Sequence, residues 1–274
     1  MGGGSYNSLS SRSRQVSTYS HQSREEVFKR KHIHSDMDPL KITIRESRDS
    51  EEHPESYPII IALDETGSMG HIPELFIKNI MPTIMEKILE AGIPNPQVCF
   101  MGIGDSATGR EEAPLQVGQF ESSDELMEKW LTNIYLEGKG GGNGHESYPL
   151  VWYFAQRRVV TDAWEKRHHK GVIITIGDEP CQRILSSNEL VAYIDENCKE
   201  DVAVASLLES VQEKWQVYHI HCNGSHTYEY SETNWEKLLG INAVVSNSKD
   251  GSDIAEIIPK LVLASYNQKD VKST

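Results

Sequence analysis

Two short segments of this 274-residue chain carry oxygen-bearing side chains at spacings suited to metal chemistry. Asp64, Thr66 and Ser68 alternate along one of them, so a single extended loop points a carboxylate and two hydroxyls in the same direction. Asp178 lies in the other segment, which reads Thr-Ile-Gly-Asp-Glu-Pro. Neither ligand set depends on a histidine or a thiolate, so these side chains would act as hard oxygen ligands of a metal ion.

A third segment adds the same kind of group. The glycine-rich stretch at 138–144 includes Asn143 and leads into Glu146. Oxygen-only ligands in small number suit Mg²⁺ or Mn²⁺, with Ca²⁺ as a further possibility and water in the remaining positions. The predicted metal ligands are therefore Asp64, Thr66, Ser68, Glu146 and Asp178. Residues predicted to lie behind them or to contact a partner are Asn143, Asp105, Glu65 and Glu179.

The elements around these segments explain how they would meet. Residues 58–63 and 172–176 are apolar at every position, which is typical of central parallel strands covered on both faces. Helical patterns alternate with strand patterns along the rest of the chain, which predicts a Rossmann-like, doubly wound α/β sheet with helices on both faces. One edge strand, at 115–120, would run antiparallel. Ligands of such sheets bind beyond the carboxyl ends of the strands, where Asp64 and Asp178 stand.

A helical pattern at 77–89 contains Pro82, which predicts a kink or two shorter helices. The first 37 residues are rich in serine and arginine and poor in aliphatic side chains, so we expect a flexible extension there. The structured domain is expected to span 38–270.

Composition excludes several classes of function. The formal net charge is −14, from 27 Lys and Arg against 41 Asp and Glu, which disfavours broad binding to nucleic-acid phosphates. No apolar run approaches the roughly 20 residues that span a bilayer. Four scattered cysteines form no disulfide framework, so a cytoplasmic protein is expected. The basic first 36 residues leave open a tether for an acidic or nucleic-acid partner.

Residues 64–69 resemble the D-x-[ST]-G-S-M signature of von Willebrand factor type A (VWA) domains, the metal-ion-dependent adhesion site (MIDAS). Residues 173–178 are similar to the strand that carries the family's later aspartate, and the likeness covers roughly residues 40–268. Segments 45–50, 102–105 and 177–179 resemble the intracellular bacterial and phage branch. The resemblance implies a Mg²⁺ ion at the rim of a Rossmann-like sheet, whose open coordination position accepts an acidic side chain of a partner protein. Intracellular relatives often work beside AAA+ ATPases of the MoxR type or in larger assemblies, so such a partner is implied as well.

The chain departs from this family in its second loop. Many members have a threonine there, whereas this sequence has Asn143 and Glu146, which resembles the D-x-P-E loop of integrin β chains, where a glutamate joins the metal shell. Three carboxylates would leave a divalent ion with a net charge of −1 before any partner arrived. A partner carboxylate would then bind a less electrophilic metal.

Four alternatives stay open at this point. In the first, Asp64 or Thr66 only caps the following helix. A zinc site at His219, His221, Cys222 and His226 matches no established ligand spacing. Cys181, as a nucleophile, has no evident base beside it.

The fourth alternative is a metal-dependent hydrolase or phosphoryl-transfer enzyme using the same rim. It would need a second acid two residues after the first, where this chain has Thr66. We therefore expect a protein-binding adhesion or adaptor domain that is not an enzyme and does not associate with membranes.

Overall fold

The computed structural model describes residues 4–106, 113–136, 145–222, 228–248 and 250–268. Its centre is a six-stranded sheet in the order β10-β9-β6-β2-β3-β4, parallel except for the β3–β4 pair. In chain order this is 3-2-1-4-5-6, the arrangement of a doubly wound fold. The expected fold class, including one antiparallel edge strand, is confirmed. The strands are β2 (Tyr57–Asp64), β3 (Pro96–Ile103), β4 (Leu115–Val117), β6 (Gly171–Gly177), β9 (Trp215–Cys222) and β10 (Ala243–Ser246).

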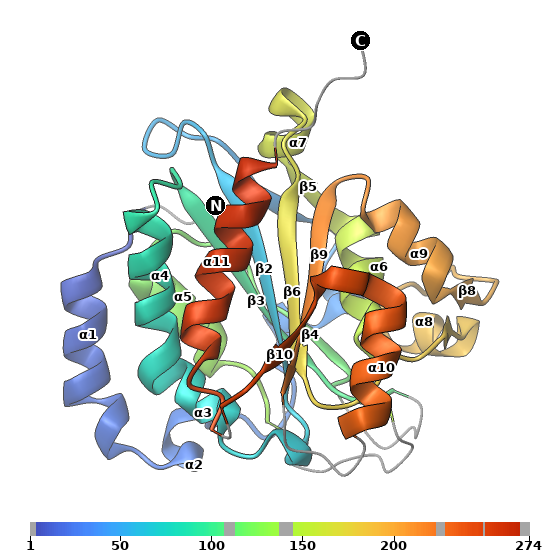
Figure 1. The fold of residues 1–274 in the computed structure, drawn as a ribbon, viewed down its shortest axis with the longest axis horizontal. Coiled ribbons are helices and arrows are strands. Elements are labelled where there is room, and N and C mark those ends of the chain that lie inside the picture. The colour runs from blue at the N-terminus through green and yellow to red at the C-terminus, as the bar shows by residue number, and fades with distance from the viewer. Residues whose placement is uncertain (1–3, 107–112, 137–144, 223–227, 249, 269–274) are drawn as a thin grey trace.

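Helices cover both faces of this sheet (Figure 1). One layer holds α3 (Ile72–Leu75), α4 (Met81–Glu90), α5 (Asp124–Thr132) and α11 (Ile254–Asn267). The other holds α6 (Pro149–Arg158), α8 (Ser187–Tyr193), α9 (Val204–Val211) and α10 (Tyr228–Leu239). At the periphery are α7 (Asp162–Arg167) and two short ribbons, β1 (Arg45–Ser47) with β5 (Val159–Thr161) and β7 (Ile184–Leu185) with β8 (Val202–Ala203).

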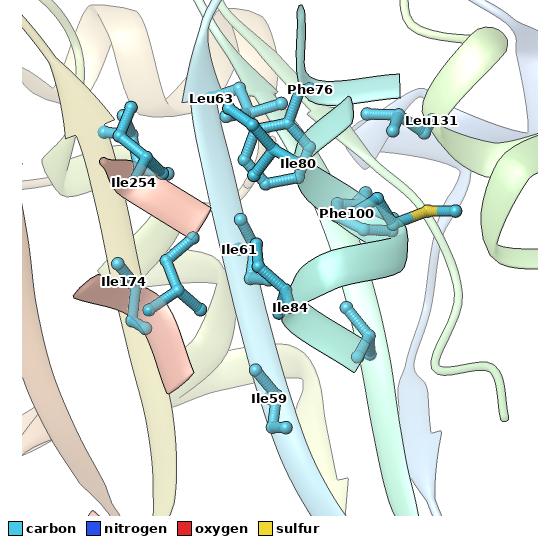
Figure 2. Close-up of a cluster of buried hydrophobic side chains, with 14 of the residues drawn as sticks. Ile59, Ile61, Leu63, Phe76, Ile80, Ile84, Phe100, Leu131, Ile174 and Ile254 are labelled. Carbon is cyan, nitrogen blue, oxygen red and sulfur yellow. The ribbon is translucent and has the colours of Figure 1, made fainter. Parts of the chain in front are cut away.

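Strand β2 shows why the apolar run in the sequence is unbroken. Ile59, Ile61 and Leu63 point to the layer of α4 and α11, where Figure 2 shows them packed with side chains of both helices and of neighbouring strands. Ile60 and Ala62 point to the layer of α6 and α9. Because successive side chains of a strand face opposite ways, a strand covered twice must be apolar throughout. This packing holds the carboxyl end of β2, and Asp64 with it, in a fixed position.

The predicted interruption of the helix near Pro82 is present. A π-helical turn at Phe76–Ile80 separates α3 from α4, and the Met81 N–H bonds to the Phe76 carbonyl. Pro82 lies in the first turn of α4, where its missing N–H costs no helical hydrogen bond. The proline therefore marks the junction of two helical segments.

The amino-terminal region differs from the expected flexible extension. Helix α1 (Ser8–Ser17) lies against α4 and α5, and the following 3-10 turn (Tyr19–His21) contacts the π-helical turn. Helix α2 (Arg24–Val27) comes next, and Arg24 donates a hydrogen bond to the Gly70 carbonyl. Val27, Phe28 and Met37 join the core on that side. The low aliphatic content misled the prediction because this segment is held largely by polar contacts to acids of α5 and by a few buried anchors.

No helix in the described ranges is long and apolar enough to cross a bilayer.

Candidate metal centre

Asp64 and Asp178 meet at the point where the winding of the sheet reverses. Strands β2 and β6 are neighbours, Asp64 is the last residue of β2, and Asp178 directly follows β6. The chain leaves β2 toward the layer of α4, and leaves β6 toward the layer of α9. The two exits therefore diverge, and doubly wound folds bind their ligands at such a switch point.

The loop at residues 64–69, here called the site loop, joins these two acids through a continuous line of oxygen atoms. Asp64 Oδ1 accepts hydrogen bonds from the Thr66 backbone N–H at 2.9 Å and from Thr66 Oγ1 at 2.6 Å. Thr66 Oγ1 lies 3.1 Å from Ser68 Oγ, which donates to Asp178 Oδ1 at 2.9 Å. Four of the five predicted ligands are thereby brought together. Thr66 precedes the 3-10 turn Gly67–Met69, but its side chain accepts no capping hydrogen bond from a backbone N–H of that turn. The Thr66 hydroxyl is therefore engaged in the site and not in capping.

The charges of both acids are poorly solvated. Asp64 is fully buried and Asp178 is 1% exposed, whereas Ser68 is exposed at the mouth of the site. Burial, and then the negative charge of Asp178, raise the pKa of Asp64 despite the donors around it. Burial, and then Glu179, raise the pKa of Asp178 to about 6. A bound cation would relieve the electrostatic strain that both shifts express.

Tyr148 completes the surroundings of Asp64, a role that sequence reasoning missed. Its hydroxyl donates to Asp64 Oδ2 at 2.8 Å, and burial together with the nearby carboxylates raises the pKa of this phenol so that it stays a donor. A Cβ at Gly177 would lie 2.0 Å from that hydroxyl, so only glycine leaves room for it. The nearest sequence signal was its position two residues after Glu146.

The donor set fits a small divalent cation. Two carboxylates and two hydroxyls converge, all are oxygen ligands, and one edge of the group faces solvent through Ser68. The donors to Asp64 itself are neutral groups, from Thr66 and Tyr148. Neutral donors leave the negative charge of Asp64 in place, so this carboxylate is suited to bind a cation. Direct coordination and coordination through water are both compatible with this set.

Glu146 reaches the same rim by its backbone. Its N–H donates to the Pro180 carbonyl at 3.2 Å, it forms a bridge with Cys181, and its side chain is only 4% exposed. Within the described ranges, however, no three acidic, histidine or cysteine side chains are grouped as a metal site. The three-carboxylate shell is therefore not assembled here, and Glu146 as a ligand stays a prediction. Asn143 lies outside the described residues.

The other predicted residues have different surroundings. Glu65 is buried and accepts hydrogen bonds from Gln116 Nε2 at 2.7 and 2.6 Å, which ties the site loop to β4 instead of to the metal rim. Asp105 is fully buried just beyond β3. The Glu179 carbonyl accepts from Trp235 Nε1 at 3.0 Å, and its carboxylate contributes to the raised pKa of Asp178. Of these three residues, Glu179 best matches the predicted position behind the metal ligands.

Two competing sites find no support in the described residues. His219 is fully buried, lies 2.9 Å by Nδ1 from Thr175 Oγ1, and stacks on Trp235 at 3.6 Å. Burial, and then His221, lower its pKa, so it packs as a neutral aromatic ring. Burial raises the pKa of Cys181 well above its usual value, which keeps the thiol protonated and unreactive. His226, the remaining member of the predicted zinc cluster, is outside the described residues.

Comparison with solved structures gives similarity at low sequence identity. SpaC, a pilus adhesin of Lactobacillus rhamnosus GG, matches with a TM-score of 0.50 and 9% identity, over 80% of this chain and 31% of that one. Proximal thread matrix protein 1 of the mussel byssus, with a zinc-occupied MIDAS motif, has a TM-score of 0.47 and 14% identity over 76% and 46%. A von Willebrand factor type A structure from Catenulispora acidiphila has a TM-score of 0.44 and 10% identity over 86% and 52%.

No protein-family model and no curated protein matches the chain. The chain spans about a third to a half of the length of these three structures. At such identities the likeness is one of fold. The VWA family that the motif at residues 64–69 implies, its MIDAS chemistry and the intracellular branch stay predictions.

Proposed function

We propose that this protein is a divalent-metal-dependent protein-binding domain and that its metal site is of the MIDAS type. The observation that carries the proposal is the line of oxygens from Asp64 through Thr66 and Ser68 to Asp178, at the switch point of the sheet. A fold-level likeness to an adhesin, and to a protein whose MIDAS motif holds zinc, is consistent with this function.

The proposed ion is Mg²⁺, with Mn²⁺ or Ca²⁺ as substitutes. Asp64, Thr66, Ser68 and Asp178 would hold it, and Glu146 would add a carboxylate from the second loop. The ion would act as a Lewis acid toward an oxygen of the partner. The chain's own part is to hold the ligands in place: β2 and β6 fix the two aspartates, and the site loop exposes Ser68 at the solvent side.

The proposed partner is a protein that offers an acidic side chain to the metal. An acidic ligand would otherwise be repelled by a chain of net charge −14, so its binding should depend strongly on the cation. By resemblance alone, the partner would be a MoxR-type AAA+ ATPase or a larger assembly in the cytoplasm.

A metal-dependent hydrolase or phosphoryl-transfer enzyme is the alternative. Such an enzyme needs a general acid or base beside the metal. The position two residues after Asp64 carries Thr66, whose hydroxyl is already bonded to Asp64. Burial keeps Cys181 protonated, so it supplies no nucleophile. We therefore propose a non-catalytic role.

Metal binding is tested by thermal and urea unfolding with increasing Mg²⁺. Mass action predicts a gain of about 2.7 kcal/mol when the free Mg²⁺ concentration is about 100 times Kd. Asp64→Asn should abolish this gain. The matched control is Asp195→Asn, which removes a charge from an acid that accepts the Tyr153 hydroxyl away from the rim. An equal gain in wild type and in Asp64→Asn would refute the site.

Partner binding is tested by pull-down with and without EDTA, followed by identification of the captured protein and reconstitution with it in purified form. We expect Mg²⁺-dependent binding that is lost in Asp64→Asn and retained in Asp195→Asn. Hydrolysis of p-nitrophenyl phosphate is measured on the same samples. Turnover above background that disappears in Asp64→Asn would favour the enzyme instead.

A further inference from the structure

The two carboxylate oxygens of Asp64 have different surroundings. Oδ1 faces the site loop and accepts both hydrogen bonds from Thr66, at 2.9 and 2.6 Å. Oδ2 faces the interior and accepts the Tyr148 hydroxyl at 2.8 Å. Oδ1 therefore lies on the side of the hydroxyl ligands, and the Thr66 hydroxyl can rotate its proton away so that both oxygens face an ion. Oδ2 is instead occupied by a donor from the amino-terminal end of α6.

Tyr148 has little freedom to leave this position. Its ring meets the rings of His219 and Trp235 edge to face, with centroids 5.2 and 5.1 Å away. The Trp235 indole is itself held by its hydrogen bond to the Glu179 carbonyl at 3.0 Å. On the remaining side the hydroxyl fills the space that Gly177 leaves free. These contacts make the hydroxyl a rigid donor.

We propose that Tyr148 is a specificity-determining residue, which makes the metal site select Mg²⁺ over Ca²⁺ by restricting Asp64 to one available oxygen. This inference rests on the proposed metal binding. Mg²⁺ requires a near-octahedral shell and takes carboxylates by one oxygen, whereas Ca²⁺ accepts six to eight ligands and commonly binds both oxygens of a carboxylate. Occupation of Oδ2 thus removes the ligand mode that would favour the larger ion.

The test is Tyr148→Phe, which keeps the ring and removes only the hydroxyl. The matched control is Tyr153→Phe on the same helix, which removes a hydroxyl that donates to Asp195 at 3.0 Å. Kd values for Mg²⁺ alone and Ca²⁺ alone are measured by calorimetry on the full chain. A general loss of structure weakens both ions together, whereas the ratio of their Kd values reports on selectivity.

In Tyr148→Phe we expect the preference for Mg²⁺ over Ca²⁺ to fall by about tenfold, which corresponds to about 1.4 kcal/mol. Tyr153→Phe should leave the ratio unchanged. An unchanged ratio in Tyr148→Phe, with both metals still bound, would overturn the inference while leaving the proposed function intact. If wild type binds neither ion, the proposed function fails and this inference fails with it.

Infrared spectroscopy of wild type keeps the inference testable if Tyr148→Phe does not fold. A carboxylate that binds through one oxygen shows a wider separation of its asymmetric and symmetric stretches than one that binds through both. The Asp64 bands, identified by their loss in Asp64→Asn, should show the wide separation even with Ca²⁺ bound. A narrow separation would contradict the proposed role of Tyr148.

Discussion

Two pairs of buried acids in this protein are treated in opposite ways. Asp124 and Glu128 of α5 have side chains only 6% and 5% exposed, so they are nearly as buried as Asp64 and Asp178 at the rim. Arg14 of α1 forms ion pairs with both acids of α5: its Nε lies 2.7 Å from Glu128 Oε2, and Nη2 bonds Asp124. At the rim, Asp64 receives hydrogen bonds only from the neutral groups of Thr66 and Tyr148 among the contacts described above.

The pKa values follow this difference. Burial acts to raise the pKa of Asp124, but hydrogen bonds from Ser10 and Arg14 hold it below its usual value. Burial and a like charge raise the pKa of Asp64, and the hydrogen bonds that act against this shift come from the neutral groups of Thr66 and Tyr148. Asp124 therefore has a charged partner from the chain. Among the described residues, the printed donors to Asp64 are neutral, which is why we propose that a cation binds there.

The largest expected effect comes from removing the internal cation. Arg14→Met keeps an unbranched side chain but leaves two buried carboxylates without their partner, so we expect a loss of about 3 kcal/mol in the free energy of unfolding. Urea denaturation measures it. The control is Arg12→Met, which breaks the exposed pair with Glu86 and should cost less than about 1 kcal/mol. Similar losses in both variants would remove the distinction between a buried and a surface contact of α1.

Removing one acid from each pair should have unequal effects in metal-free protein. Asp124→Asn weakens charged hydrogen bonds to Arg14 and Ser10 and should cost about 1.5 kcal/mol. Asp178→Asn relieves repulsion with Asp64 and keeps an oxygen for Ser68, so the stability should be unchanged or higher. Urea unfolding in EDTA measures both. A substantial loss in Asp178→Asn would mean that the rim pair is already balanced without metal.

Acid should erase the contribution of the α5 pair. Since the pKa of Asp124 is lowered in the folded protein, its stabilisation is complete above the unfolded value of about 3.9 and is lost as the pH falls below it. The difference in urea midpoint between wild type and Asp124→Asn should therefore shrink between pH 5 and pH 2.5. A difference that stays constant over this range would show that the charge of Asp124 is not what stabilises α1.

Salt should have the smallest effect. At 1 M NaCl the screening length is about 3 Å, so the exposed pair of Arg12 with Glu86 should lose most of its contribution of about 0.5 kcal/mol. The more buried pair of Arg14 with Glu128 should lose less. Urea unfolding of Arg12→Met and Arg14→Met at low and high salt separates the two. The difference in the free energy of unfolding between wild type and Arg12→Met should shrink at high salt. The difference between wild type and Arg14→Met should stay nearly constant.

Much of the fold was predictable because its signals are local. The unbroken apolar run at 58–63, the helical spacing around Pro82 and the alternation of strands with helices each reflect burial of a single element. The amino-terminal segment was wrongly expected to be flexible. Its helix is held by contacts such as Ser11 and Arg14 to Glu128, more than 100 residues away, which no local pattern records.

The site was predictable to a similar degree. Asp64, Thr66 and Ser68 could be assigned from their alternation, and Asp178 from its place after an apolar strand, and the structure joins these four by hydrogen bonds. Glu146 was also predicted as a ligand and stays a prediction, because the position of its carboxylate relative to the two aspartates depends on tertiary packing. Tyr148 was missed, because its contact with Asp64 joins segments that are distant in the sequence.

By itself, the amino-acid sequence determined which oxygens stand at the ends of which strands, because strand burial and loop alternation are properties of neighbouring residues. Only the tertiary structure decided which side chains contact each buried acid. Those contacts come from distant segments, Arg14 onto α5 in one case and Tyr148 onto Asp64 in the other. Because such neighbours set the electrostatic energy of a buried acid, they underlie the proposal that the rim pair holds a metal.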